Sequence, residues 1–465
     1  MCRVRVLWKE NELLAAVGGK AEGQLSASGV AFDSREIGKG DLFFAMQGEA
    51  TDGHLFVDRA FANGAAGAVV SEPVAHPHIL VDDTMAALNA LGSASRVRVK
   101  GKIIGVTGSA GKTGTKEVLY AALDRASRGH AHRSVKSYNN HVGVPLSLAR
   151  MPENTQYGVF EMGMNHAGEL RELTKLVRPN VAIITTVAPA HIGFFKDEAE
   201  IADAKAEIFE GLMPGGMAII PADNLHYLRL RSAAEKFAAY TVSFGFAADA
   251  DVRVLDYVAA PGGGSLITAK LPGGTLCYTL SQPGKHWIAN SLAILAAVEA
   301  VGGDLAAAGL AMAELGGMPG RGARYQISTA AGTATLIDES YNANPASMAV
   351  TIDELANSAM GRRVVVLGAM RELGDKSDDY HLALAGPLAD AKVDYAILVG
   401  DEMQVLAEKL KAGVEGPANF AHCANAGEAL ELLRNSLRGS DTILVKGSNS
   451  LGLSSIVKAL VGEGG

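Results

Sequence analysis

A strand pattern, a glycine-rich turn and a helix pattern follow one another without a break, and this unit constrains the fold most. A β-rich run over 102–106 leads into TGSAGKT at 107–113, and a helical pattern continues to about Ala126. Consecutive backbone N–H groups at a helix start form a nest for an anion; Lys112 adds a point charge and Thr113 a hydroxyl able to ligate Mg²⁺. The unit therefore predicts a parallel sheet covered by helices, with a phosphate-binding loop after one strand.

The glycine turn departs in one place from the full phosphate-loop pattern G-x-x-x-x-G-K-[ST]. Val106 stands five positions before Gly111, where the pattern has glycine. The shorter TGSAGKT form is still specific, and a coincidental glycine turn is the alternative. The residues predicted to bind the phosphates are Thr107, Gly108, Ser109, Ala110, Gly111, Lys112 and Thr113.

The remaining pattern indicates more than one hydrophobic core, as expected for 465 residues. Strand patterns alternate with helix patterns, which is typical of parallel sheets. Short β-like runs between Thr241 and Leu280 predict a small antiparallel insertion. We expect an α/β protein of three domains: a small α/β domain over 1–99, a central phosphate-binding parallel sheet with the insertion over 100–317, and a Rossmann-like α/β domain over 318–465.

Two connecting segments are expected at the domain boundaries. An apolar helix is predicted to end near Asn89, and the run RVRVKG at 96–101 is interpreted as a connector. The run GGMPG at 316–320 is typical of a hinge.

Composition excludes several classes of partner. The net charge of −8 argues against nucleic acid and anionic lipid, so an anionic substrate must be held by local groups. No window approaches the roughly 20 apolar residues of a membrane span, and the start does not resemble a signal peptide. The scattered Cys2, Cys277 and Cys423 suit a reducing compartment. We expect a cytoplasmic, soluble monomer without nucleic-acid partner or membrane insertion.

Three polar residues follow or lie between the central strand patterns. Glu161 ends a strand pattern, where open α/β sheets place ligand groups, so it could hold Mg²⁺; a helix cap is the alternative. His191 follows another strand pattern. It could bind a metal or a phosphate, or it could be an ordinary histidine of the core or of a turn. Lys205 lies on a helix pattern, where periodicity alone favours a surface lysine.

The last third of the chain carries further candidates. Asp338 ends a strand pattern, and Tyr341 and Asn344 follow it. An acidic residue at the end of a strand is suited to bind a ribose hydroxyl. Asn-Pro pairs are also common in turns without a function, so this signal alone is weak. Arg321, between two glycines, is either a mobile phosphate-binding arginine or a solvated loop residue.

Taken in order, these segments resemble the Mur ligases, which couple an amino acid or peptide to a UDP-N-acetylmuramoyl precursor at the expense of ATP. TGSAGKT resembles the family's phosphate loop, Glu161 its Mg²⁺-binding glutamate and His191 the histidine near a second metal. Lys205, in AKAEIF, matches the lysine that is carbamylated in most members. The resemblance implies γ-phosphate contact by Arg321, adenine contacts by His286 and Asn290, and ribose and base contacts by Asp338 and Tyr341.

The resemblance also implies roles for these residues in the reaction. ATP and two Mg²⁺ ions are the expected cofactors, with a carbamate on Lys205. The implied catalytic residues are Lys112, Glu161, His191, Lys205 and Arg321, and the implied metal ligands are Thr113, Glu161, His191 and Lys205.

Other stretches point to one member of the family. The DSR run at 33–35 resembles the UDP-binding domain of the two later ligases, and SYNNHVGVP at 137–145 their substrate-binding segment. ESYNANPASM, LGAMRELG and LVKGSNS resemble the member that appends D-alanyl-D-alanine to the UDP-linked muramoyl tripeptide through an acyl phosphate. The implied substrate contacts are Ser34, Arg35, Asn139, Asn140, Asn344 and Lys446.

Departures and alternatives accompany this resemblance. Trp287 stands where many members have asparagine, Ala369 where aspartate is expected and Asn449 where arginine is expected. The nearest alternative is the ligase that adds diaminopimelate or lysine as the third residue, but its D-N-P-[RK] motif is absent. A folate-type glutamate ligase and a nucleotide-dependent regulatory protein are the others.

Overall fold

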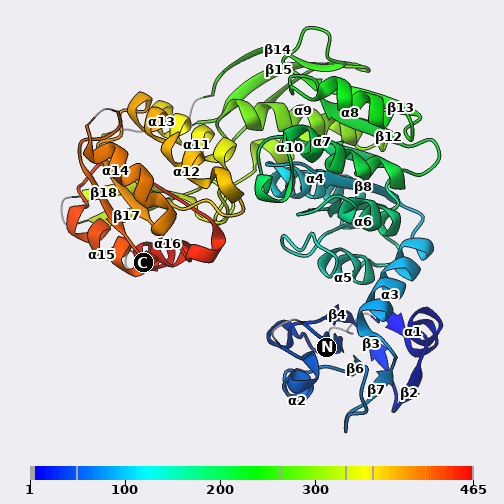
Figure 1. The fold of residues 1–465 in the computed structure, drawn as a ribbon. Helices are drawn as coiled ribbons and strands as arrows, with labels where there is room; N and C mark the ends of the chain where they lie inside the picture. The colour runs from blue at the N-terminus through cyan, green and yellow to red at the C-terminus, as the bar shows by residue number, and fades with distance from the viewer. Residues whose placement is uncertain are drawn as a thin grey trace.

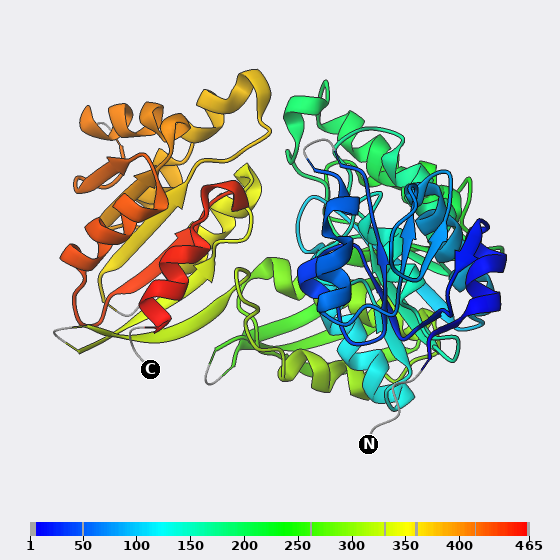
Figure 2. The same cartoon turned by 90° about the horizontal axis from the view of Figure 1, so that it is seen from below.

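The computed structural model describes residues 6–48, 51–260, 263–329, 332–358, 361–413 and 415–462. Three α/β domains follow one another along the chain, each with its own main sheet (Figure 1). In the view from below, the N-terminal domain lies in front of the central one and the C-terminal domain beside it (Figure 2). The expected fold class is confirmed.

The N-terminal domain is built on a five-stranded sheet of order β2-β7-β6-β5-β4. Its middle strands DLFF and GAVV are buried on both faces, because apart from Asp41 they carry small or apolar residues in a continuous run rather than at alternate positions. Strands β4 to β7 are parallel and β2 is antiparallel at the edge. The elements are β1 (Trp8–Lys9), α1 (Glu10–Val17), β2 (Lys20–Glu22), β3 (Ser26–Ala27), β4 (Gly29–Ala31), β5 (Asp41–Phe44), α2 (Val57–Ala62), β6 (Gly67–Val70), β7 (His78–Leu80) and α3 (Thr84–Arg98).

The central domain is built on a nine-stranded sheet of order β16-β15-β14-β13-β12-β11-β8-β10-β9. The expected antiparallel residues do not form a separate unit: β13 is a parallel strand, and β14 to β16 extend the main sheet. The strands are β8 (Lys102–Thr107), β9 (Ala131–Arg133), β10 (Tyr157–Glu161), β11 (Val181–Ile184), β12 (Met217–Pro221), β13 (Tyr240–Gly245), β14 (Val252–Ala259), β15 (Ser265–Leu271) and β16 (Gly274–Leu280). The helices are α4 (Lys112–Ser127), α5 (Gly143–Ala149), α6 (Glu169–Val177), α7 (Glu198–Ala206), α8 (Tyr227–Ala234), α9 (Lys285–Ala300) and α10 (Leu305–Ala313).

The C-terminal domain has a six-stranded sheet of order β17-β18-β22-β19-β20-β21, parallel except for β17. Residues 314–322, which include the expected hinge, connect α10 to this sheet. The elements are β17 (Ala323–Thr329), β18 (Gly332–Glu339), α11 (Pro345–Ser358), β19 (Arg363–Gly368), α12 (Ser377–Leu382), α13 (Ala385–Asp390), β20 (Tyr395–Val399), α14 (Gln404–Lys411), β21 (Phe420–Cys423), α15 (Ala426–Ser436), β22 (Thr442–Lys446) and α16 (Ser454–Gly462).

Helix α3 joins the first two domains, and here the sequence prediction was wrong. The helix does not end near Asn89 but runs to Arg98, so the expected connector is largely its last turn. Asp83 caps its start by accepting the N–H groups of Met85 and Ala86. Near its end, the Arg96 guanidinium donates from Nε to Val177 O and from Nη2 to Arg178 O, both at 2.8 Å, which fastens α3 to the end of α6.

Arg98 ties the same helix end to the chain start and to the central domain. Its guanidinium lies 3.5 Å from the ring centre of Trp8 and donates to Leu7 O and Met151 O, each at 3.1 Å. The Trp8 indole donates to Ala149 O at 2.8 Å. These contacts make the junction a packed joint rather than a linker.

Two further expectations concern the whole chain. Within the residues that the structure describes, no helix is long and apolar enough to cross a membrane. Cys277 is exposed and Cys423 buried, both as free thiols, and Cys2 lies outside the described residues.

We predict that Arg98→Ala lowers the free energy of unfolding by about 2 kcal/mol, because a half-buried cation–π contact and two hydrogen bonds are lost together. Urea denaturation measures this. Arg59→Ala, an exposed arginine on α2, is the control and should change the value by less than about 0.5 kcal/mol. Equal effects of the two substitutions would contradict the packed joint.

Candidate active site

A cleft of about 530 Å³ lies where the carboxyl ends of two parallel sheets face each other. The central domain contributes the loops that follow β8, β10, β11 and β12, and the C-terminal domain those that follow β18 and β22. Loops at the carboxyl ends of parallel strands are where α/β proteins bind ligands. The cleft is therefore the candidate site.

The expected phosphate loop forms one wall of the cleft. Gly111 has φ of 82° and ends the loop at the start of α4. A Cβ at this position would lie 2.6 Å from Asn290 Nδ2, so only glycine fits. The Lys112 ammonium donates to Gly108 O at 2.5 Å across the loop. Burial, only partly offset by the charge of Glu161, lowers the pKa of Lys112.

Glu161 lies beside the loop as the centre of a polar cluster. Glu161, the last residue of β10, pairs with Val106 on β8, and this pairing brings the end of β10 next to α4. The carboxylate is 1% exposed and accepts from Thr113 Oγ1 at 2.9 Å and from Asn139 Nδ2 at 2.8 Å. The side chain therefore faces the end of the phosphate loop and accepts from side chains rather than capping a helix through its backbone N–H groups. Carboxylate and hydroxyl oxygens are ligands that Mg²⁺ accepts.

The described part of the chain contains no cluster of three or more His, Cys, Asp or Glu side chains that could hold a metal alone. Mg²⁺ is usually held by one or two carboxylates together with water and substrate phosphates. The Thr113 and Glu161 pair fits that second kind of site.

Lys205 on α7 lines the same cleft, and the surface-lysine interpretation is wrong. The residue is 2% exposed. Burial, reinforced by the nearby Lys112 charge, holds the pKa of Lys205 well below its usual value. Within the described ranges no hydrogen-bond or ion-pair partner of its amine is found. The site thus contains a buried amine with a strong tendency to be neutral.

His191 lies at the edge of the cleft and touches the C-terminal domain. Its backbone is left-handed, with φ of 58°, and its ring Nδ1 contacts Glu372 Oε2. The hydrogen bond with His191 lowers the pKa of Glu372. Gly193 N also donates to Glu372 O at 3.0 Å. His191 is therefore neither a core residue nor isolated, because it forms a contact between two domains.

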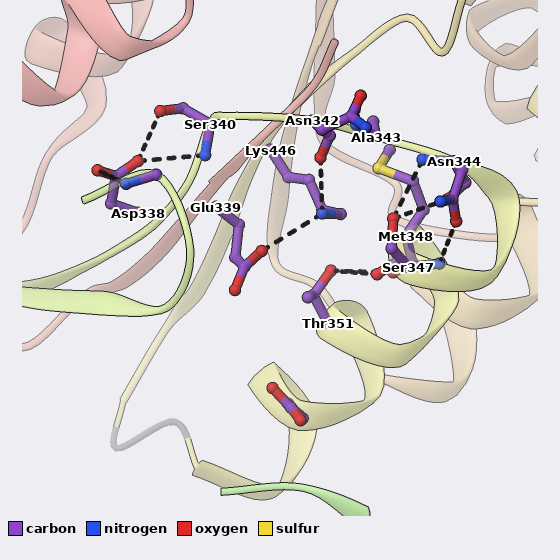
Figure 3. Close-up of polar contacts among 12 residues, drawn as sticks. Asp338, Glu339, Ser340, Asn342, Ala343, Asn344, Ser347, Met348, Thr351 and Lys446 are labelled. Carbon is purple, nitrogen blue, oxygen red and sulfur yellow. Dashed lines mark hydrogen bonds and ion pairs between the residues drawn. The ribbon is translucent and has the colours of Figure 1, made fainter. Parts of the chain in front are cut away.

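The C-terminal wall carries Arg321, Tyr341 and Lys446. The Arg321 guanidinium lies 4.1 Å from the ring centre of Tyr341. Lys446 is 2% exposed and donates to Asn342 O at 3.0 Å, with Glu339 Oε2 at 3.4 Å (Figure 3). Burial lowers the pKa of Lys446 despite the Glu339 charge.

Asp338 is turned away from this wall. One carboxylate oxygen accepts from Gly320 N at 2.6 Å, and the other accepts from the Ser340 amide and hydroxyl (Figure 3). The side chain is buried and is not among the residues that line the cleft. It holds the segment that carries Arg321.

Asn344 joins the C-terminal domain to the phosphate loop. Its side-chain oxygen accepts from Ser347 N at 2.8 Å at the start of α11 (Figure 3), and its Nδ2 donates to Ser109 O at 3.4 Å. Asn344 lines the cleft.

The segment expected near adenine lines the cleft at the start of α9. His286 and Asn290 are both on its surface, and His286 Nδ1 is 3.1 Å from Glu354 Oε1 of α11. Trp287 packs on the first turn of α4, where a Cβ on Gly114 would lie 2.5 Å from the indole. The tryptophan therefore takes the space that a side chain on α4 would otherwise occupy.

Three expected substrate residues are not in this cleft. Ser34 is buried in the N-terminal domain, and Arg35 forms a forked ion pair with Asp33, with Nη2 2.6 Å from Oδ2. The Asn140 side chain accepts from Gly143 N at 2.9 Å and so holds the start of α5. Its neighbour Asn139 does line the cleft.

Sequence reasoning missed several residues around the loop. Thr185, just after β11, donates to Ala110 O at 2.5 Å, and Asn224, after β12, also lines the cleft. Their position after strand patterns was the available signal. Lys116 on α4 carries no such signal, because nothing in the sequence distinguishes a lysine four residues after Lys112 from an ordinary lysine on the surface of a helix.

Comparisons with known proteins agree with this architecture. Three family models match: "Mur ligase family, catalytic domain" over 26–125, "Mur ligase middle domain" over 106–298 and "Mur ligase, glutamate ligase domain" over 323–449. The UDP-N-acetylmuramoyl-tripeptide–D-alanyl-D-alanine ligase of Escherichia coli K12 is 34% identical over 457 residues, covering 98% of each chain. That of Bacillus subtilis 168 is 33% identical over 93% of each. A crystal structure of MurF from Acinetobacter baumannii aligns with a TM-score of 0.83 and 31% identity, over 98% of this chain and 99% of the other.

We predict that Gly111→Ala weakens binding of an ATP analogue by at least about tenfold, because it adds a left-handed side chain that clashes with Asn290. Gly129→Ala is the matched control: its φ of 87° imposes the same strain, but nothing lies within 4 Å of the added Cβ. Calorimetric titration measures both. Equal losses would mean that the close approach to Asn290 does not shape the loop.

Proposed function

The chain belongs to the Mur ligase family, and from this premise we infer that it catalyses ATP-dependent ligation of D-alanyl-D-alanine to UDP-N-acetylmuramoyl tripeptide. The products are the UDP-linked pentapeptide, ADP and phosphate. The observation that carries this function is the cleft between the carboxyl ends of the central and C-terminal sheets. Lys112 of the phosphate loop, Arg321 and Lys446 all line it.

The chemistry explains why positive charge gathers there. An amide forms from a carboxylate only after its oxygen becomes a leaving group, and the γ-phosphate of ATP provides one as an acyl phosphate. The terminal carboxylate of the tripeptide attacks phosphorus, ADP leaves, and the dipeptide amine then displaces phosphate. The first step brings two anions together, so fixed cations in a dry cleft lower its barrier. Lys112 and Arg321 supply that charge at the phosphates.

Thr113 and Glu161 would hold Mg²⁺ at the phosphates. When bound, the ion would spread the negative charge of the phosphoryl oxygens. Asn139 holds one Glu161 oxygen at 2.8 Å, so the carboxylate is oriented before any ligand binds. His191 and Lys205 line the same cleft, and His191 would bind a second ion through Nε2, since Nδ1 contacts Glu372.

Lys205 is proposed to react with carbon dioxide. A neutral amine attacks the carbon of CO₂, the new N–C bond forms, and the nitrogen loses a proton to give a carbamate anion. The lowered pKa of Lys205 favours the neutral amine that this reaction needs. The resulting anion would face Lys112 instead of repelling it and could ligate the second metal.

The other substrate contacts are assigned from the resemblance to the family. Ser34 and Arg35 would lie near the uridine diphosphate, Asn139 and Asn140 near the tripeptide, and Asn344 and Lys446 near the dipeptide. Asp338 supports the nucleotide site through the Gly320–Arg321 segment rather than through the cleft wall. We propose domain limits of 1–99, 100–317 and 318–465, since each main sheet falls within one range, and a monomer.

The related ligase that adds the third residue is the competing function. The absence of its D-N-P-[RK] motif speaks against it, as do the full-length relatives that act with D-alanyl-D-alanine. A regulatory nucleotide switch would leave the buried Lys205 and the Glu161 cluster without a joint use.

We predict that ADP release from ATP and UDP-muramoyl tripeptide depends on D-alanyl-D-alanine and is not supported by diaminopimelate, lysine or glutamate. Lys112→Ala should lower kcat/KM roughly a thousandfold, because the fixed charge at the phosphates is lost. Lys236→Ala, an exposed lysine, is the control and should leave it unchanged. Turnover without an amine acceptor, or full activity of Lys112→Ala, would overturn the proposed function.

We predict that Lys205→Ala lowers kcat roughly 10²- to 10³-fold and that formate or acetate restores part of the activity by replacing the carbamate. Lys175→Ala, on the exposed side of α6, is the control and should neither lose activity nor respond to the acids. An unmodified Lys205 in intact-mass and ¹³CO₂ NMR measurements, with no rescue, would contradict the carbamate.

A further inference from the structure

A second buried lysine lies behind the phosphate loop, outside the proposed reaction chemistry. Lys116 follows Lys112 by one turn of α4 and is completely buried, at 0% exposure. Burying an ammonium costs several kcal/mol unless nearby groups compensate it. Its partners therefore indicate what it does.

The Lys116 ammonium touches two functional segments at once. It donates to Lys136 O, in the loop that leads to Asn139, and is 3.0 Å from Glu117 Oε1. It is also 3.9 Å from Glu161 Oε2, the oxygen that accepts the Thr113 hydroxyl. The ammonium thus stands between the candidate metal carboxylate and the substrate loop.

The loop that Lys116 holds continues into the N-terminal domain. Lys136 has a left-handed backbone, with φ of 49°, so the orientation of its carbonyl is set by a conformation that non-glycine residues rarely adopt. The Lys136 side chain pairs with Glu36, and Tyr138 OH donates to the same Glu36 oxygen at 3.1 Å. Glu36 directly follows Ser34 and Arg35.

We propose that Lys116 is a positioning residue that links the two ends of the site. It fixes the loop 136–139 through the Lys136 carbonyl and offsets part of the Glu161 charge, so that one ammonium sets both the tripeptide loop and the affinity of the metal carboxylate. This inference rests on the proposed function, but its first test measures metal binding and needs no turnover.

The sign of the expected effect follows from the charges. Lys116→Met keeps an unbranched side chain that is one atom shorter and removes one positive charge 3.9 Å from Glu161, so the carboxylate should attract a divalent cation more strongly. Mn²⁺ titration of the protein with a bound non-hydrolysable ATP analogue, followed by electron paramagnetic resonance, should show binding tighter by at least about tenfold. At the same time KM for the UDP-tripeptide should rise several-fold, with a smaller change in kcat, because loop 136–139 loses its support.

Two further variants separate positioning from simple stability. Lys116→Arg keeps the charge and should keep Mn²⁺ binding near that of the parent protein. Glu117→Gln, at a partly exposed position, should weaken Mn²⁺ binding, because the ammonium is then shared by fewer carboxylates. Ser127→Ala, at the far end of α4, is the matched helix control and should alter neither Mn²⁺ binding nor KM.

The proposal fails if Lys116→Met binds Mn²⁺ no more tightly and keeps its KM while only the melting temperature falls. Should Lys116→Met not fold, unchanged Mn²⁺ binding in Glu117→Gln would overturn it equally. Either failure leaves the proposed function intact, since that function is decided by acceptor-dependent ADP release.

Discussion

The whole site depends on lysine amines that the protein buries in one cleft, where the loss of water disfavours their charged forms. Lys112, Lys205, Arg321 and Lys446 line one cleft, and burial lowers the pKa of each of the three lysines. The carboxylates on the same surface are Glu161, Asp223 and Glu339. A bound triphosphate and peptide carboxylate would stabilise the charged forms of Lys112 and Lys446, so binding energy from the anions brings them together where the reaction needs them.

The domains differ in how firmly they are joined. The N-terminal domain is fastened to the central one by α3, where Arg96 and Arg98 donate to five backbone carbonyls. Three of these, Met151 O, Val177 O and Arg178 O, belong to the central domain. The C-terminal domain meets the central one through side-chain pairs such as His191 with Glu372 and His286 with Glu354. The His191–Glu372 pair is partly exposed, and ion pairs at such positions contribute little to stability, so we expect any domain motion at residues 314–322.

Local features were predictable from sequence, and long-range ones were not. Strand β8 and helix α4 lie within a residue or two of expectation, because the glycine turn and the helix start between them are encoded by adjacent residues. Helix periodicity did not reveal the burial of Lys205, since the pattern says nothing of the cleft that this residue lines. Arg98 was interpreted as part of a connector, because its partners Leu7 and Met151 are far away in sequence. Asp338 was placed at a ribose, but Gly320 takes its carboxylate.

The most direct test of the central claim follows one oxygen atom. If the cleft phosphorylates the peptide acid, a tripeptide with ¹⁸O in its terminal carboxylate must transfer one labelled oxygen to phosphate when the amide forms. Mass spectrometry of the released phosphate should then show one ¹⁸O for each D-alanyl-D-alanine joined. Unlabelled phosphate, released at the same rate as the pentapeptide product, would contradict the acyl phosphate and with it this account of the site.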